Sequence, residues 1–262
     1  MNVRRLSLIC AAMLAAIICI SQLCVAQEIT VAAAADLQFA MQDIASRFQS
    51  ATGKTVKPIY GSSGNFLQQI QNGAPFDVFF SANLGYAKEL EAAGMTEPGS
   101  YYEYAKGRIV IWVPNASKLD LSIGMKALLD PAVKKIAIAN PLHAPYGQAA
   151  VAAMQRENIY DRLKDKFVLG ENISQTAAFV VSGAADIGVV ALSLVLSPNM
   201  KDKGRYVEVP EEDYPPIEQA CVILRSSKNK DVARQFLSFI KTPAIHDMLK
   251  SYGFNVPASS GK

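Results

Sequence analysis

Two adjacent serines between glycines, in residues 61–65 (Gly-Ser-Ser-Gly-Asn), form the part of this chain best suited to hold a small anion. They follow a β-branched run and precede an apolar pattern at helical spacing that starts at Phe66, which predicts a strand-to-helix turn. Hydroxyls and free backbone N–H groups at such a turn lie at the positive end of the helix dipole, where an oxyanion can bind. The alternative is a structural turn whose serines only cap the next helix.

A second turn of this kind contains Ala35 and Asp36, between the apolar run 29–34 and a helical pattern that starts at Leu37. Both turns are expected at the same sheet edge, where α/β folds bind ligands. We interpret Asp36 as the N-cap of the following helix, because Asp is one of the strongest capping residues. If its carboxylate faced the ligand instead, it would repel an anion.

Two further turns come from the middle of the chain. Residues 140–147 follow a buried strand and precede an Ala-rich helix, so Tyr146 offers a phenol and a backbone N–H to a cleft or simply packs at the helix start. Residues 172–174 open another helix, whose amides are either ligand donors or an ordinary helix start.

Signals for catalysis or for a resident metal are weak. The serine turn does not match the Gly-x-Ser-x-Gly elbow, because Asn65 replaces the last glycine, and only His143 and His246 could act as a base. No Cys or His pair has metal-ligand spacing, and no P-loop lysine follows a glycine-rich loop. The chain is predicted to bind rather than to react, with no cofactor; a serine hydrolase using Ser63 is the enzymatic alternative.

The N-terminus indicates export. Arg4 and Arg5 precede an apolar run and small residues up to Ala26, which is typical of a secretory signal peptide spanning residues 1–26. Cleavage there leaves 236 residues with one cysteine, Cys221, and a net charge of +1 instead of +3. The fold must then depend on apolar burial, and the charge gives no case for nucleic acid. We expect a monomer in the periplasm.

Apolar runs alternate with helical patterns along the mature chain, which favours α/β layers with largely parallel sheets. The runs predicted as strands are 29–34, 55–60, 78–80, 109–113, 136–139, 187–191, 207–209 and 220–224. Prolines near 114 and 210–216 flank a middle segment with strands and helices of its own. We therefore expect residues 27–108 plus 217–262 to form one lobe and residues 109–216 to form an inserted second lobe, with a ligand cleft between them.

Together these segments resemble the periplasmic molybdate-binding proteins of ABC importers, within the type II periplasmic binding fold. The resemblance covers nearly the whole mature chain. Its carriers are Val-Ala-Ala-Ala-Ala-Asp-Leu at 31–37, Gly-Ser-Ser-Gly at 61–64, Asn-Gly-Ala-Pro-Phe-Asp at 72–77, Asn-Pro at 140–141 with Ala-Pro-Tyr-Gly at 144–147, Gly-Ala-Ala-Asp-Ile-Gly at 183–188 and Tyr-Gly-Phe at 252–254.

The resemblance implies a two-lobed α/β fold, each lobe with a mixed, mostly parallel sheet flanked by helices. It implies capture of molybdate or tungstate in the cleft by neutral donors and delivery to an ABC permease in the inner membrane. The binding positions fall on Ala35 or Asp36, Ser63, Tyr146 and, through its backbone N–H, Ile173. Molybdenum would be present only within the bound oxyanion.

One departure from the family concerns the first turn. The family often has a hydroxyl or amide side chain where this chain has Ala35 and Asp36, which removes one donor. Another oxyanion, such as phosphate or sulfate, is therefore an alternative ligand. A cationic or amino-acid solute with Asp36 as its counter-charge is a third hypothesis.

Overall fold

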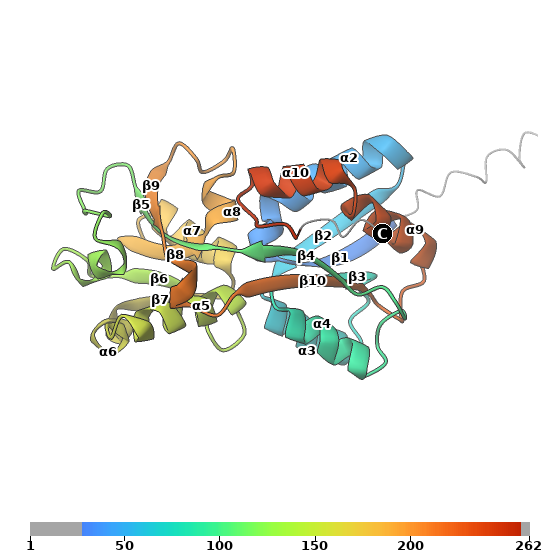
Figure 1. Ribbon diagram of the computed structural model, residues 1–262, viewed down its shortest axis with the longest axis horizontal. Coiled ribbons are helices and arrows are strands. Elements are labelled where there is room, and N and C mark those ends of the chain that lie inside the picture. The colour runs from blue at the N-terminus through green and yellow to red at the C-terminus, as the bar shows by residue number, and fades with distance from the viewer. Residues whose placement is uncertain (1–27, 258–262) are drawn as a thin grey trace, which may run out of the picture.

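The computed structural model describes residues 28–257, which form two lobes, each built on one mixed β-sheet with helices against it (Figure 1). The predicted signal peptide lies outside the described residues, as does the C-terminal tail 258–262. Among the described residues, no helix is long and apolar enough to span a membrane.

The first sheet has the strand order β2-β1-β3-β10-β4. Its strands are β1 (Glu28–Ala34), β2 (Thr55–Gly61), β3 (Val78–Ser81), β4 (Tyr102–Gly107) and β10 (Ile217–Ile223). Strand β1 pairs in parallel with β2 and β3, whereas β10 runs antiparallel to β3 and β4. Because β1, β2 and β3 run in one direction, their carboxyl ends share one edge of the sheet.

The second sheet repeats this plan with the order β7-β6-β8-β5-β9. Its strands are β5 (Ile109–Pro114), β6 (Ile136–Ala139), β7 (Phe167–Gly170), β8 (Ile187–Ala191) and β9 (Gly204–Glu208). Strand β6 is parallel to β7 and β8, and β5 is antiparallel to β8 and β9. The mixed sheets are as predicted, but antiparallel pairings are as frequent as parallel ones in each.

The chain passes between the two sheets twice. It leaves the first sheet after β4, which ends at Gly107, and enters the second at Ile109. It returns between the end of β9 at Glu208 and the start of β10 at Ile217 (Figure 1). The two connections lie side by side, because β4 pairs with β10 and β5 pairs with β9.

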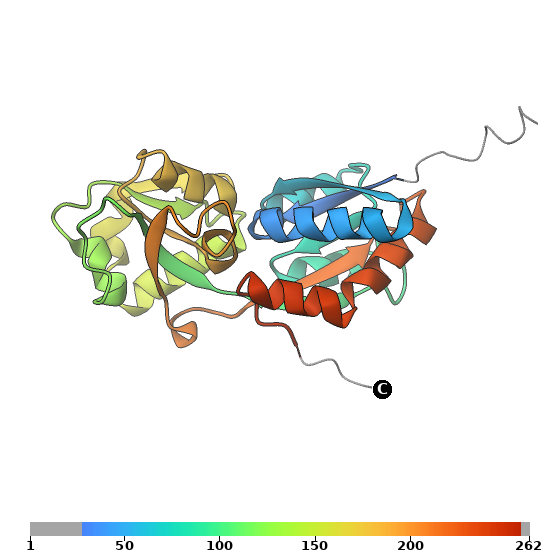
Figure 2. The ribbon, with the colours of Figure 1, turned by 90° about the horizontal axis from the view of Figure 1, so that it is seen from above.

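Helices cover both faces of the first sheet. On one face lie α2 (Gln38–Thr52), α9 (Lys230–Ile240) and α10 (Pro243–Ser251), and on the other α3 (Ser63–Gln71) and α4 (Leu84–Ala92) (Figures 1 and 2). The second lobe contains α5 (Pro145–Arg156), α6 (Tyr160–Leu163), α7 (Ile173–Val181) and α8 (Leu192–Val195). Short 3₁₀ helices complete the described chain: η1 (Ala35–Leu37), η2 (Gly124–Leu129), η3 (Lys164–Lys166) and η4 (Glu211–Asp213).

The four predicted turns occur where the lobes face each other. Strand β1 leads into η1, β2 into α3, β6 into α5 and β7 into α7. Strands β4 and β7 were not among the predicted runs. Both are edge strands: charged residues interrupt β4, and β7 has only three apolar residues, which are partly exposed.

Aromatic packing holds α9 against the first lobe. The Phe236 ring packs edge-on against Phe48 from α2 at a centroid distance of 5.1 Å and at a tilt against Phe80 from β3 at 6.0 Å, and all three side chains are buried. Such contacts add to the hydrophobic stabilisation that burial provides.

Replacing Phe236 with Ala should lower the free energy of unfolding by about 3–5 kcal/mol, because it removes a buried ring and leaves a cavity. Urea unfolding followed by circular dichroism would measure the change. Gln235→Ala, at an exposed position on the same helix, is the matched control and should change stability little. Equal effects of the two substitutions would contradict this view of the core.

Candidate functional site

A small cavity lies between the lobes, with walls from both. All five residues predicted to bind the ligand line it. They are Ala35, Asp36, Ser63, Tyr146 and Ile173, joined by Ala34, Gly61, Ser62, Ala82, Ala144 and Pro145. Tertiary structure therefore brings together four turns that are far apart in the sequence.

Three helices begin at this cavity. Ser63 is the first residue of α3, Tyr146 the second residue of α5 and Ile173 the first residue of α7. Each helix contributes the partial positive charge of its N-terminus, and 3₁₀ helix η1 follows β1 at the same place. Converging N-termini favour negative charge in the space between them.

Most amides in the first turn of α3 already have acceptors. Gly64 N–H donates to the backbone oxygen of His143, Asn65 N–H to Ser62 Oγ and Phe66 N–H to the Ser62 carbonyl. The expectation of several free amides in this turn is therefore wrong, and the Ser63 amide is the one outside these bonds. Of the two roles predicted for this turn, helix capping falls to Ser62, whereas Ser63 lines the cavity where an anion could bind.

The Ser63 side chain is buried, and its Oγ accepts a hydrogen bond from the Ala82 backbone N–H at 2.9 Å. This bond uses an oxygen lone pair and leaves the hydroxyl hydrogen available to donate. Ala82 lines the same cavity, so Ser63 is held at its wall. The hydroxyl is thus a neutral donor in a fixed position.

Asp36 does not cap a helix, contrary to the sequence interpretation. No side-chain capping bond is made at the start of η1 or α2. Instead, Asp36 Oδ2 accepts from the Tyr146 hydroxyl at 2.9 Å and from Gln219 Nε2 at 2.7 Å. The carboxyl group is therefore used to join α5 of the second lobe to β10 of the first.

Two residues of β4 complete this network: Tyr104 adds a hydrogen bond, and Gly107 leaves space for the Tyr146 hydroxyl. The Tyr104 hydroxyl donates to Gln219 Oε1 at 2.6 Å, which directs Gln219 Nε2 toward Asp36 and toward Tyr146 Oη at 3.1 Å. A Cβ at Gly107 would collide with the Tyr146 hydroxyl, so this position needs glycine. Every hydroxyl and amide of the network has a partner, as buried polar groups require.

The second oxygen of Asp36 differs, because Oδ1 is buried without a hydrogen-bond partner. Asp36 is only 1% exposed, and this desolvation raises its pKa from 3.8 to about 6, against the opposing effects of the hydrogen bonds from Gln219 and Tyr146. The same burial, together with the nearby Asp36 charge, raises the pKa of the Tyr146 hydroxyl, which remains a protonated donor.

Gln219 was missed by the sequence analysis. A polar residue inside the otherwise apolar run of β10 was its one available signal, and it is completely buried. The Tyr146 phenol was considered as a ligand donor, but its hydroxyl donates to Asp36 instead. Only the backbone N–H of Tyr146 is then available as a donor to a ligand in the cavity.

Further hydrogen bonds join the lobes around the cavity. Ser62 Oγ pairs with His143 Nδ1 at 2.8 Å, and Gly64 N–H donates to the His143 carbonyl at 2.9 Å. A Cβ on Gly64 would lie 2.6 Å from that carbonyl oxygen, so glycine permits the close approach. On the other side, Ser174 donates to the Ala35 carbonyl and Ser193 to the Asp36 carbonyl. The structure is therefore a closed form.

No lysine or arginine is among the residues that line the cavity. The described residues also contain no cluster of three His, Cys, Asp or Glu side chains that could hold a metal ion. Any anion bound here would be neutralised by N–H and O–H dipoles rather than by an ion pair.

The hydrolase alternative does not fit the geometry. Ser63 Oγ bonds to Ala82 N–H, whereas His143 bonds to the neighbouring Ser62 and its Nε2 lies 3.5 Å from Glu171. His246 pairs with the Tyr102 hydroxyl at 2.9 Å. Neither histidine is hydrogen-bonded to the Ser63 hydroxyl, which a general base requires.

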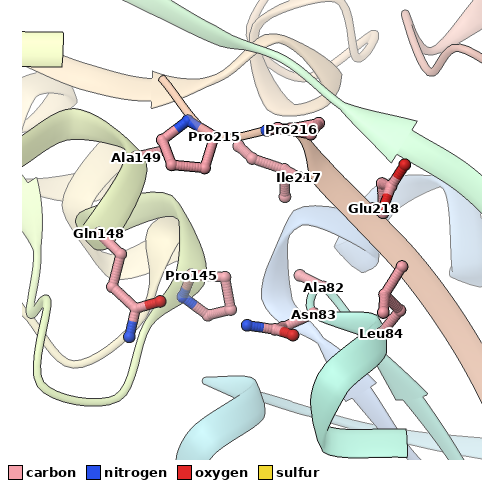
Figure 3. Close-up of a pocket in the computed structure, with 10 residues that line it drawn as sticks. All are labelled: Ala82, Asn83, Leu84, Pro145, Gln148, Ala149, Pro215, Pro216, Ile217 and Glu218. Atoms are coloured by element: carbon pink, nitrogen blue, oxygen red, sulfur yellow. The ribbon is translucent and has the colours of Figure 1, made fainter. Parts of the chain in front are cut away.

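A wider groove between the lobes adjoins the cavity (Figure 3). It shares Ala82 and Pro145 with the cavity, and is lined otherwise by Asn83, Leu84, Gln148, Ala149, Pro215, Pro216, Ile217 and Glu218. Pro215 and Pro216 end the second connection between the lobes, just before β10, so this groove lies beside it.

Comparison with known families gives one match across almost the whole described chain, to the model of "Bacterial extracellular solute-binding protein" at residues 29–255. The chain belongs to this family. The family is named for binding solutes, which agrees with the prediction that this chain is a binding protein and not an enzyme.

Relatives of this solute-binding protein make the resemblance more specific. It is 37% identical to the molybdate-binding protein ModA of Rhodobacter capsulatus, covering 87% of this chain and 88% of that protein. It is 38% identical to ModA of Azotobacter vinelandii, covering 89% and 92%. The solved periplasmic molybdate-binding protein of A. vinelandii superposes with a TM-score of 0.83 at 34% identity, covering 88% of this chain and 100% of that one. The resemblance predicted from the sequence is confirmed.

The Asp36 carboxyl should make the stability of the solute-binding protein depend on pH. Its pKa is about 6 in the folded protein, above the ordinary value of 3.8 that applies in the unfolded chain. Between these two pH values the folded state therefore holds more protons than the unfolded state. The free energy of unfolding should therefore fall as pH rises through this window, by about 3 kcal/mol from this group.

Chemical unfolding of the wild type and Asp36→Asn across the window would measure this effect. The Asn carbonyl can still accept from Tyr146 and Gln219 but cannot ionise, so the variant should lack this part of the pH dependence. Asp161→Asn, at an exposed site of the second lobe, is the control and should retain it. Parallel curves for wild type and Asp36→Asn would contradict the assignment.

Proposed function

We propose that this solute-binding protein captures molybdate or tungstate in the cavity between its lobes and delivers it to an ABC permease. The observation that carries the proposal is the convergence of three helix N-termini and the Ser63 hydroxyl on a small cavity without a lysine or arginine in its walls. Relatives named as molybdate-binding proteins support it.

The donors proposed for the anion come from both lobes. They are the hydroxyl and amide of Ser63, the turn at Ala35 and Asp36, and the amides of Tyr146 and Ile173. Hydrogen bonds to a charged group contribute about 1.5–3 kcal/mol each, so four or five of them can replace an ion pair. Since the donors are neutral, the size of the cavity decides which tetrahedral dianion fits.

Ligand binding is proposed to drive closure. The first lobe captures the dianion at Ser63 and the Asp36 turn, and the second lobe then brings the amides of Tyr146 and Ile173 over it. The cross-lobe bonds of Ser174 and Ser193 to η1 form only in the closed arrangement, which gives binding a structural consequence. A permease could then distinguish the loaded protein.

Phosphate is the rival ligand that a specific observation favours. Asp36 lines the cavity, and the protonated form of phosphate present near neutral pH brings a donor for which a carboxylate would be an acceptor. Sulfate has the charge and shape of molybdate but is smaller.

Export by the predicted signal peptide and action as a periplasmic monomer complete the proposal.

Calorimetric titration of the mature protein with molybdate, tungstate, sulfate, phosphate and a panel of amino acids tests the ligand. We expect sub-micromolar binding, about −8 kcal/mol or stronger, for molybdate and tungstate alone. Tight binding of phosphate or of an amino acid in their place would reject the proposal, as would the absence of heat with every oxyanion.

Ser63→Ala should weaken molybdate binding by about tenfold or more, since it removes one donor to a charged ligand and each 1.4 kcal/mol is a factor of about ten. The same titration measures it. Ser182→Ala, at the exposed serine that follows α7 as its C-cap, is the matched control and should bind as the wild type does. Unchanged affinity in Ser63→Ala would remove this hydroxyl from the site.

A further inference from the structure

The Asp36 carboxyl group presents a problem for any anion in the cavity. It lines the cavity, is almost fully buried, and has one oxygen without a partner. An ionised carboxylate here would repel a dianion in surroundings where water cannot screen the repulsion. No arginine or lysine among the lining residues offsets its charge.

The surrounding hydrogen bonds distinguish the two oxygens. Tyr146 and Gln219 both donate to Oδ2, and Tyr104 fixes the orientation of the Gln219 amide. A carboxylic acid accepts hydrogen bonds at its carbonyl oxygen and donates from its hydroxyl oxygen. With Oδ2 occupied as a double acceptor, a proton on the group belongs on Oδ1, which is the oxygen without a hydrogen-bond partner.

We propose that Asp36 is protonated on Oδ1 when the oxyanion is bound and donates this hydrogen to a ligand oxygen, so that binding takes up one proton from solvent. The inference rests on the proposed function and deepens it. It assigns to Asp36 the donor that Ala35, without a polar side chain, cannot supply. The proton adds a positive charge to the site, which lowers the net charge that closure must bury.

The neighbouring titratable groups favour this assignment. The phenols of Tyr146 and Tyr104 face Asp36 and stay protonated. Helices α7 and α8, which pack on η1, carry no titratable side chain. The remaining charged residues of the elements packed on η1 are exposed: Lys57 of β2, and Asp43 and Arg47 of α2, with Tyr60 of β2 half-buried. Burial raises the Asp36 pKa to about 6, so the proton is available at moderate cost.

The test is calorimetry of the mature protein with sodium molybdate in buffers of different ionisation enthalpy, from about pH 6 to about pH 8, where dilute molybdate is a dianion. The dependence of the observed heat on buffer enthalpy counts the protons taken up. We expect about one proton at the upper end, and an affinity that falls about 50-fold from the lower to the upper end.

Asp36→Asn is the decisive variant. Its carbonyl can accept from Tyr146 and Gln219, while its amide donates permanently from the Oδ1 position. It should bind molybdate without proton uptake, with an affinity that no longer changes with pH and exceeds that of the wild type at the upper end. Asp161→Asn, the exposed control, should behave as the wild type in all three respects.

The outcomes separate this inference from the proposed function. Wild-type binding with no proton uptake and a flat pH profile would overturn the role of Asp36 and leave molybdate capture intact. Absence of binding to any oxyanion at every pH would overturn both. Because the proton count is made on the wild type, the inference can fail even where Asp36→Asn does not fold.

Discussion

The burial of one carboxyl group between the lobes is the constraint on which the rest of the site depends. Asp36 can be buried because Tyr146 from the second lobe and Gln219 from the first donate to the same oxygen. These bonds tie α5 to β10 and hold the walls of the cavity together. Gly107 is required for the same reason, since a side chain there would displace the Tyr146 hydroxyl. Closure of the lobes and the state of this carboxyl are thereby linked.

The cavity is suited to an anion by the positions of its dipoles rather than by charged side chains. Helices α3, α5 and α7 point their N-termini at one small space, and each supplies a partial positive charge at a buried residue. Fixed dipoles of this kind do not need to reorganise when an anion arrives. The bonds of Ser174 and Ser193 to backbone oxygens of η1 place the two lobes in register, so both sets of proposed donors face the same cavity.

Much of the fold could be predicted because burial is encoded in local patterns. The apolar runs predicted the central strands, and the spacing at Met41, Ile44 and Phe48 predicted the buried face of α2. Edge strands β4 and β7 were missed because Glu103 and Lys106 interrupt the first and the apolar run of the second is only three residues long. The five predicted site residues line one cavity because each follows a strand. The partners of their polar atoms could not be predicted, since these partners lie between 19 and 183 positions away in the chain.

The sequence by itself determined the alternation of strands and helices, the four turns and the family, because these depend on residue types at short spacing. Only the tertiary structure decided what the turns do. It directed the Asp36 side chain to Tyr146 and Gln219 instead of to a helix amide, and left the other oxygen of this carboxyl without a hydrogen-bond partner. It also made Ser62 the cap of α3 while Ser63 lines the cavity. The physical reason is that hydrogen-bond partners of buried groups are chosen by proximity in space, which folding creates and local sequence does not contain.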